Sequence, residues 1–269
     1  MEKEYLSPKS DIIFKLIFGD ERSIEILTGF LKAVLDIPES DYENVSIVDP
    51  HLLRQHEGDK LGILDVKVKT KSQKVIDIEI QIRPKPHLEK RVVLYLSKMV
   101  VEQIGTGRDY AKIQRAISII ITDYTLKHDN DKSEKDLKLK HDNKKSDKDL
   151  KLKHDNKYHN RYSLCDKTGK QFTDILEVNT LELSKLPETA DGTALWAWLK
   201  FLKSESKEEF EMVAEKNPTI GKAVARLVEL SQDERTRMLY ESRQMLEWDI
   251  DIGKRTARQE GILLVARNW

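Results

Sequence analysis

The side chains best suited to chemistry lie in one short stretch, residues 75–82. Asp77, Glu79 and Gln81 alternate there with isoleucines. Because successive side chains of a strand point to opposite faces, the three polar side chains share one face and the isoleucines share the other. The stretch just before it, residues 64–69, alternates in the same way. Together the two stretches predict a pair of strands, each apolar on one face and polar on the other.

Asp65 lies on the polar face of the first strand and faces Glu79 when the two strands form a hairpin. The connection is short, and the pairing that sets Asp65 beside Glu79 leaves a three-residue turn, with Gln81 just beyond. Two carboxylates this close repel each other unless one is protonated or a cation lies between them. Such oxygen ligands suit Mg²⁺ or another divalent cation, such as Mn²⁺ or Ca²⁺. A metal held in this way supports phosphodiester hydrolysis, because it activates water and stabilises charge on a phosphoryl oxygen.

A second interpretation of the same pattern stays open. Half-exposed strands commonly alternate polar and apolar residues. Asp65, Glu79 and the neighbouring lysines therefore also fit a solvated face joined by surface ion pairs, with no metal and no catalysis.

The elements that position these residues can be predicted from hydrophobic periodicity. Helices are expected at residues 10–18, 22–35 and 88–104, and strands at 45–48, 61–69, 75–82, 116–122, 158–164 and 172–182. After residue 187 the pattern is helical, with helices expected at 192–202, 207–216, 219–230 and 233–267. We therefore expect an α/β domain over residues 1–187 and a helical region over 188–269.

A tandem repeat interrupts the α/β pattern at about residues 127–157. The sequence Leu-Lys-His-Asp-Asn begins at Leu126, Leu139 and Leu152, a period of 13 residues. Repeat units this polar bury little apolar surface, so we expect a solvated, mobile excursion from a hairpin between two strands. The segment holds eleven Lys against eight Asp and Glu, a balance that argues against a basic arm for gripping DNA.

Composition narrows the class of protein. Lys and Arg total 47 and Asp and Glu total 47, and a neutral total neither supports nor excludes a nucleic-acid partner. The single cysteine, Cys165, excludes a disulfide framework within the chain and fits the cytoplasm. No apolar run reaches the roughly 18 residues of a membrane helix, and the charged first residues lack an apolar leader. These features predict a soluble, cytoplasmic protein without a membrane partner.

Several blocks resemble, in order, the Rpn branch of the PD-(D/E)XK nucleases, which comprises recombination-promoting nucleases and transposases. Asp65 followed by the run 77–81 (DIEIQ) resembles the Asp…Glu-x-Gln signature of that branch. The run 8–19 (PKSDIIFKLIFG) resembles its opening helix. The run 91–98 and the following Gly105-x-Gly107-x-x-Tyr110 resemble its Arg-x-x-x-Tyr helix and turn, and 117–123 and 181–183 resemble later core strands.

The resemblance implies a restriction-endonuclease-like core, in which helices flank a central mixed sheet. It implies that Asp65 and Glu79 bind the divalent metal and that Gln81 takes the place of the superfamily's lysine, which orients or activates the attacking water. Glutamine binds a water but contributes no positive charge. The resemblance also implies accessory or DNA-contacting roles for Asp11, Lys15, Arg91, Tyr95 and Lys98.

The function expected from residues and resemblance together is a metal-dependent DNA endonuclease that acts in recombination or transposition of mobile elements. One alternative keeps the fold without efficient catalysis, as a nuclease descendant that binds DNA. A further alternative is a protein-interaction module built on the C-terminal helices, which would also form a homo-oligomer.

Overall fold

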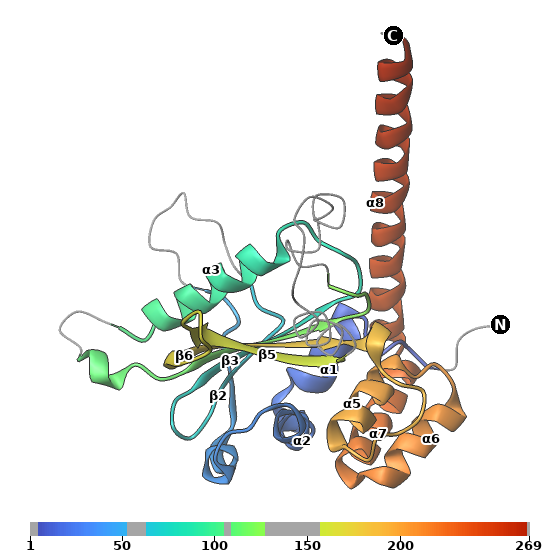
Figure 1. Ribbon diagram of the computed structural model, residues 1–269. Coiled ribbons are helices and arrows are strands. Elements are labelled where there is room, and N and C mark those ends of the chain that lie inside the picture. The colour runs from blue at the N-terminus through green and yellow to red at the C-terminus, as the bar shows by residue number, and fades with distance from the viewer. Residues whose placement is uncertain (1–4, 53–62, 105–108, 127–156, 268–269) are drawn as a thin grey trace, which may run out of the picture.

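The computed structural model describes residues 5–52, 63–104, 109–126 and 157–267. The 13-residue repeats and the turn with Gly105 and Gly107 therefore lie outside the described residues. At the centre is a six-stranded sheet, and helices cover both of its faces (Figure 1). This architecture confirms the fold class expected from the sequence.

The strands run in the order β1-β2-β3-β4-β6-β5 across the sheet. Strands β1, β2 and β3 are antiparallel neighbours, β4 is parallel to both β3 and β6, and β5 returns antiparallel at the edge. The bounds are Ser46–Val48 for β1, Val66–Lys69 for β2, Val75–Gln81 for β3, Ala116–Thr122 for β4, His159–Cys165 for β5 and Gln171–Glu182 for β6.

The sheet order corrects one expectation about the repeats. They connect β4 to β5, but these strands do not form a hairpin, because β6 lies between them. Strand β6 pairs with β4 on one side and with β5 on the other. Sequence proximity suggested the hairpin, but β4 pairs along its full length with β6, so β5 can pair only with the other side of β6.

One face of the sheet carries the larger core. The isoleucines of β3, with Ile117, Ile119 and Ile121 of β4, point into it and meet the α1 and α2 helices and the C-terminal helices. The helix bounds are Asp11–Phe18 for α1, Ile24–Val34 for α2, Ala194–Lys203 for α5, Lys207–Lys216 for α6 and Pro218–Gln232 for α7, with 3-10 turns at Glu21–Ser23, Glu39–Asn44, Tyr110–Lys112 and Leu183–Lys185. Trp198 of α5 is fully buried and packs on Phe18, Phe30 and Phe201. The C-terminal helices α5 to α7 thus share one core with the sheet.

Helix α3, Leu88–Val101, covers the opposite face (Figure 1). Its apolar side chains, among them Val92, Leu96 and Met99, pack on Ala116 and Ile120 of β4. The polar residues of β3 point to the same face. Asp77, at 1% exposure, is as buried there as the isoleucines on the other face.

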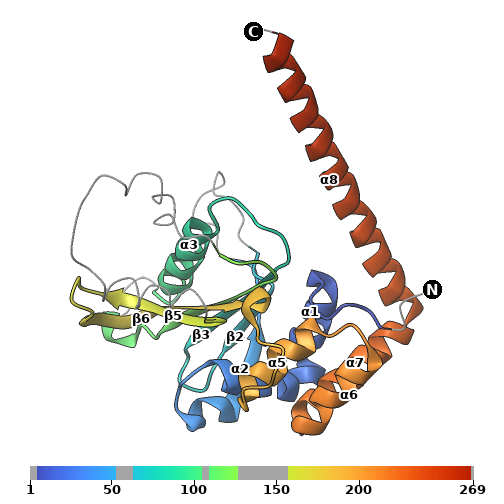
Figure 2. The same ribbon diagram turned by 45° about the vertical axis from the view of Figure 1, so that its right-hand side comes forward.

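The last helix, α8, spans Glu234–Arg267 and projects away from the body of the molecule (Figures 1 and 2). Several of its large apolar side chains are exposed. None of the helices in the described part of the chain combines the length and the apolar composition that a membrane crossing requires.

Candidate active site

The β2–β3 hairpin sets Asp65 beside Glu79. Val66 pairs with Ile78 in the antiparallel ladder, so the next two residues outward face each other, which is the register that the sequence predicted. The turn closes through Gln73, whose φ of 64° is left-handed, as the last residue of a three-residue hairpin turn requires. The short turn thus fixes which carboxylates meet.

Asp65 lies just before β2 and takes no part in the backbone pairing of β2 with β3. The sequence predicted a strand over 61–69, but β2 begins at Val66. Asp65 Oδ2 accepts a hydrogen bond of 3.1 Å from the amide of Ile80, where a backbone carbonyl of a longer strand would otherwise bind. The other oxygen, Oδ1, lies 3.0 Å from Nζ of Lys15 on α1. The carboxylate is therefore held to β3 on one side and faces a cation on the other.

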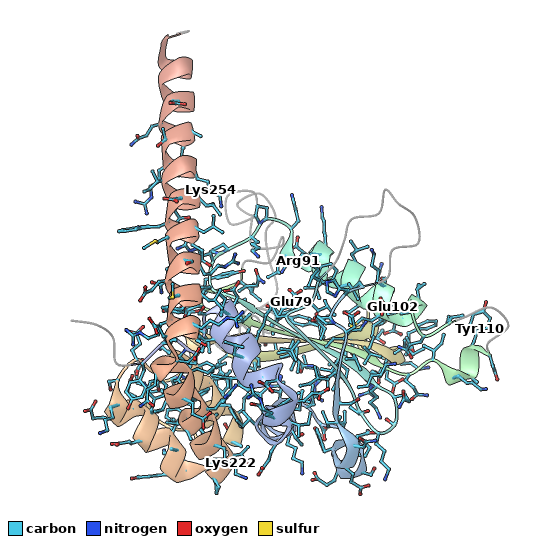
Figure 3. The ribbon with its side chains drawn as sticks, turned by 180° about the vertical axis from the view of Figure 1, so that it is seen from behind. Glu79, Arg91, Glu102, Tyr110, Lys222 and Lys254 are labelled. Atoms are coloured by element: carbon cyan, nitrogen blue, oxygen red, sulfur yellow. The ribbon has the colours of Figure 1, made fainter. Side chains whose placement is uncertain are left out.

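Glu79 is almost completely buried, at 3% exposure. Its Oε2 accepts a hydrogen bond of 2.7 Å from Nη2 of Arg91, which reaches down from α3. Figure 3 shows these two labelled side chains together between α3 and the sheet. Burial raises the pKa of Glu79, Arg91 opposes that rise and the charge of Asp65 adds to it. The burial excludes the alternative of a solvated polar face for β3.

Asp77 is a member of the site that the sequence analysis placed on this face without giving it a role. Its Oδ2 accepts a hydrogen bond of 3.1 Å from Ser118 on the neighbouring strand, and burial followed by the charge of Glu79 raises its pKa well above the ordinary value. Its Oδ1 is buried without a hydrogen-bond partner among the described residues. The alternation along β3 was the signal that could have found it.

Gln81 closes this row of polar side chains at the end of β3. It is 6% exposed, and within the described ranges its Oε1 has no hydrogen-bond partner. A buried acceptor without a partner is unfavourable by itself, so a donor such as an ordered water fits this place. The amide thus points into the same buried layer as Glu79.

The other predicted residues divide between two places. Tyr95 lies beside the site, because the guanidinium carbon of Arg91 is 5.7 Å from the centre of its ring, and burial and Glu79 raise its pKa. Lys98 is half-buried one turn further along α3. Asp11 instead pairs with Arg243 of α8, at 2.6 Å. The structure therefore groups Lys15, Arg91 and Tyr95 with the carboxylates and directs Asp11 to the C-terminal helix.

The donor set fits a small, hard divalent cation. No three His, Cys, Asp or Glu side chains gather as a metal-binding group in the ranges that the structure describes, but Mg²⁺ takes one or two carboxylates and keeps several waters. Asp65 and Glu79 supply two carboxylates, and Gln81 adds a buried oxygen that accepts no hydrogen bond from the described part of the chain. Lys15 pairs with Asp65 and Arg91 pairs with Glu79, so each carboxylate has a basic side chain beside it.

The chain matches the model of a known protein family. The model described as "PD-(D/E)XK nuclease family transposase" matches residues 8–153 and 146–257. The two matched segments overlap at residues 146–153, inside the tandem repeats, and together they include the sheet, its flanking helices and most of α8. No curated protein and no solved structure matches the chain.

Proposed function

The chain belongs to the PD-(D/E)XK nuclease family transposases, and from this premise we propose that it is a metal-dependent endonuclease of DNA. Its reaction is the hydrolysis of phosphodiester bonds during recombination or transposition of a mobile element. We place it in the cytoplasm, which fits a chain whose single cysteine, Cys165, is exposed and cannot form a disulfide within the chain.

The observation that carries this proposal is the pairing of Asp65 with Glu79 on a buried hairpin face. Both carboxylates face cationic groups of this chain, so the site already attracts positive charge. A bound Mg²⁺, Mn²⁺ or Ca²⁺ would lower the pKa of a water ligand and stabilise charge on the phosphoryl oxygens. The Gln81 amide, with its buried Oε1, accepts a hydrogen bond from the attacking water and orients it.

Nicking of supercoiled plasmid DNA by the purified full chain tests the proposal. The assay is run with each of the three metals, beside Asp65→Ala and Glu79→Ala. Removing either carboxylate removes a metal ligand, so both variants should lose nicking. A matched control is Glu43→Ala, because the Glu43 carboxylate is 61% exposed and pairs with Lys71 of the hairpin turn, away from the site.

Metal-dependent nicking that Asp65→Ala and Glu79→Ala abolish, and that Glu43→Ala preserves, supports the nuclease and its site together. Circular dichroism and thermal unfolding of each variant separate a loss of chemistry from a loss of fold. Nicking that survives Glu79→Ala in a folded protein contradicts the site, and no nicking by the folded wild-type chain with any of the metals contradicts the activity.

One observation favours a second function. Gln81 is neutral, so it adds no positive charge for the transition state, and a nuclease descendant that binds DNA without efficient cleavage is consistent with that residue. A gel-shift titration with a DNA duplex separates the two functions. Binding by a folded wild-type chain that nicks no DNA with any metal favours this second function.

We also propose that the chain forms a dimer through α8, with a second copy of the same helix as the partner. Several large apolar residues of α8 have an exposed fraction between 47% and 70%. They are Met238, Leu239, Met245, Leu246, Trp248, Ile250 and Ile252. Met238, Met245 and Ile252 recur every seven residues, which is the spacing at which helices pack on one another in coiled coils.

Sedimentation velocity of the full chain at micromolar concentration tests the α8 dimer. The wild-type chain should sediment as a dimer, and the double variant Trp248→Glu/Ile252→Glu should sediment as a monomer, because it buries charge in the interface. A monomeric wild-type chain at tens of micromolar contradicts this proposal.

A further inference from the structure

Asp65 and Glu79, the two proposed metal ligands, differ in how firmly each holds the basic side chain beside it. Arg91 pairs with the buried Glu79 and also lies over the ring of Tyr95, and its side chain is 27% exposed. Lys15 pairs with Asp65, and its side chain is 42% exposed. A pair that reaches solvent opens easily, whereas breaking a buried pair leaves an uncompensated charge. Of the two pairs, Lys15 with Asp65 is therefore the one that opens more readily.

Asp65 does not need Lys15 to keep its position. The bond of 3.1 Å from the Ile80 amide to Oδ2 anchors the carboxylate to β3, whichever cation faces Oδ1. Throughout the described part of the chain, Asp65 is the only ion-pair partner of Lys15. Asp65 would therefore keep its position if the ammonium group of Lys15 gave way to a divalent cation.

We propose that Lys15 is a catalytic residue that changes partners, pairing with Asp65 in the metal-free protein and with the scissile phosphate once a divalent cation occupies Asp65. This inference rests on the proposed function, since it assigns a role within the same site. Lysine suits the exchange, because its compact ammonium sits on a flexible stem and carries three donors. The α1 helix keeps its backbone at the edge of the site during the exchange.

The chemistry needs such a cation. In the hydrolysis the oxygen of a water forms a bond to phosphorus, the bond from phosphorus to the leaving oxygen breaks, and a proton passes from the attacking water to solvent while the leaving oxygen takes one up. Negative charge gathers on the phosphoryl oxygens in the transition state. Gln81 cannot balance this charge and Arg91 is engaged by Glu79. Lys15 supplies the balancing positive charge by donating a hydrogen bond to a phosphoryl oxygen. The ammonium group of Lys15 stays protonated throughout.

The exchange predicts two effects of opposite sign in Lys15→Met. Calorimetric titration with Mn²⁺ should show tighter binding by about two- to fivefold, the factor that a half-exposed ion pair is worth, because the competing ammonium is gone. Plasmid nicking should fall about a hundredfold, the usual effect of removing one group that stabilises transition-state charge. Lys15→Arg, which keeps the charge, should recover part of the nicking.

The matched control is Lys32→Met, because the Lys32 side chain is 43% exposed and pairs with Glu39 away from the site. It should leave both the Mn²⁺ affinity and the nicking rate unchanged. Weaker Mn²⁺ binding in Lys15→Met, or no Mn²⁺ binding by either chain, overturns the exchange. Unchanged nicking in Lys15→Met overturns the catalytic role while leaving the proposed nuclease intact. If the wild-type chain nicks no DNA, the nuclease and the catalytic role of Lys15 both fail, and the Mn²⁺ titration still decides whether Lys15 competes with the metal.

Discussion

Glu79 on β3 accepts a hydrogen bond of 2.7 Å from Arg91 on α3, although the side chain of Glu79 is only 4% exposed. Burial raises the pKa of this carboxyl group, and the guanidinium of Arg91 opposes the rise because it favours the charged form. The same bond ties α3 to the sheet directly above the proposed metal ligands. The pair of Glu79 and Arg91 therefore contributes both to the stability of the fold and to the charge of the site.

Arg91→Met should destabilise the protein by about 3 kcal/mol, because it leaves the buried carboxylate of Glu79 without a partner. The double variant Glu79→Gln/Arg91→Met should be less destabilised than Arg91→Met alone, since it removes the charge that needs compensation. Urea unfolding of the four proteins of this cycle measures the effect. Equal destabilisation of the single and double variants would contradict a coupled pair.

Two substitutions of Asp65 should distinguish its structural role from its role in metal binding. Asp65→Asn keeps an acceptor for the Ile80 amide, whereas Asp65→Ala leaves that amide without a partner and should lose about 1–3 kcal/mol more in free energy of unfolding. Both variants lack a charged metal ligand, so both should lose nicking. Chemical unfolding beside the plasmid assay checks this, and equal stability of the two variants would show that the bond to Ile80 contributes little.

Asp20 should make the protein sensitive to acid. The hydrogen bond from Arg22, with the charge of Arg226 adding to it, lowers the pKa of Asp20 to about 2 against an opposing effect of burial. A lowered pKa stabilises the fold above the ordinary value of 3.8, and that contribution disappears as the pH falls from about 4 through about 2. Because the Arg22 side chain is 75% exposed, solvent screens the interaction, and the contribution to stability is about 1 kcal/mol.

Asp20→Asn should accordingly be less stable than the wild-type chain at pH 6, and the difference should shrink toward pH 2. Urea unfolding at several pH values measures it. Asp36→Asn is the control, because the Asp36 side chain is 90% exposed and its ion pair with Arg161 is long, at 3.9 Å. A difference between Asp20→Asn and wild type that does not change with pH would contradict the assignment.

Substitution of two tryptophans in the C-terminal helices should change the stability of the fold to very different extents. Trp198→Ala removes a fully buried ring from the aromatic cluster with Phe18 and Phe30 and should destabilise the fold by about 3–5 kcal/mol. Trp248→Ala removes a ring that is 70% exposed and should change the stability of the monomer by less than about 1 kcal/mol. Thermal unfolding at low protein concentration compares them. Similar losses for both would contradict the shared core of α5 and the sheet.

Local pattern was sufficient to predict the hairpin at the centre of the site. A period of two fixes the faces of β2 and β3, and a short connection leaves few registers, so the pairing of Asp65 with Glu79 followed from the sequence and the structure confirms it. The strand over 116–122 was also predicted correctly, since a continuous apolar run is typical of a strand buried on both faces.

Contacts between distant segments could not be predicted in this way. The position of β6 between β4 and β5 depends on the packing of the whole sheet. Arg91 was expected among the DNA-contacting residues, and its hydrogen bond to Glu79 was not predicted, because α3 covers a polar face that looked half-exposed in the sequence. The partner of Asp11, Arg243, is 232 residues away and lies on another helix. Local periodicity carries no signal for such pairs.

The tandem repeats connect two strands that do not pair with each other, and this affects how the gene can change in length. Because β4 ends at Thr122 and β5 begins at His159 without pairing to it, no turn geometry dictates how many residues join the two strands. Lengthening a connection of this kind is thermodynamically mild, since each doubling adds only about 0.6 kcal/mol. Replication slippage that adds or deletes a 13-residue unit should therefore escape selection, and isolates carrying this gene should differ in copy number while the residues around Asp65 and Glu79 stay the same.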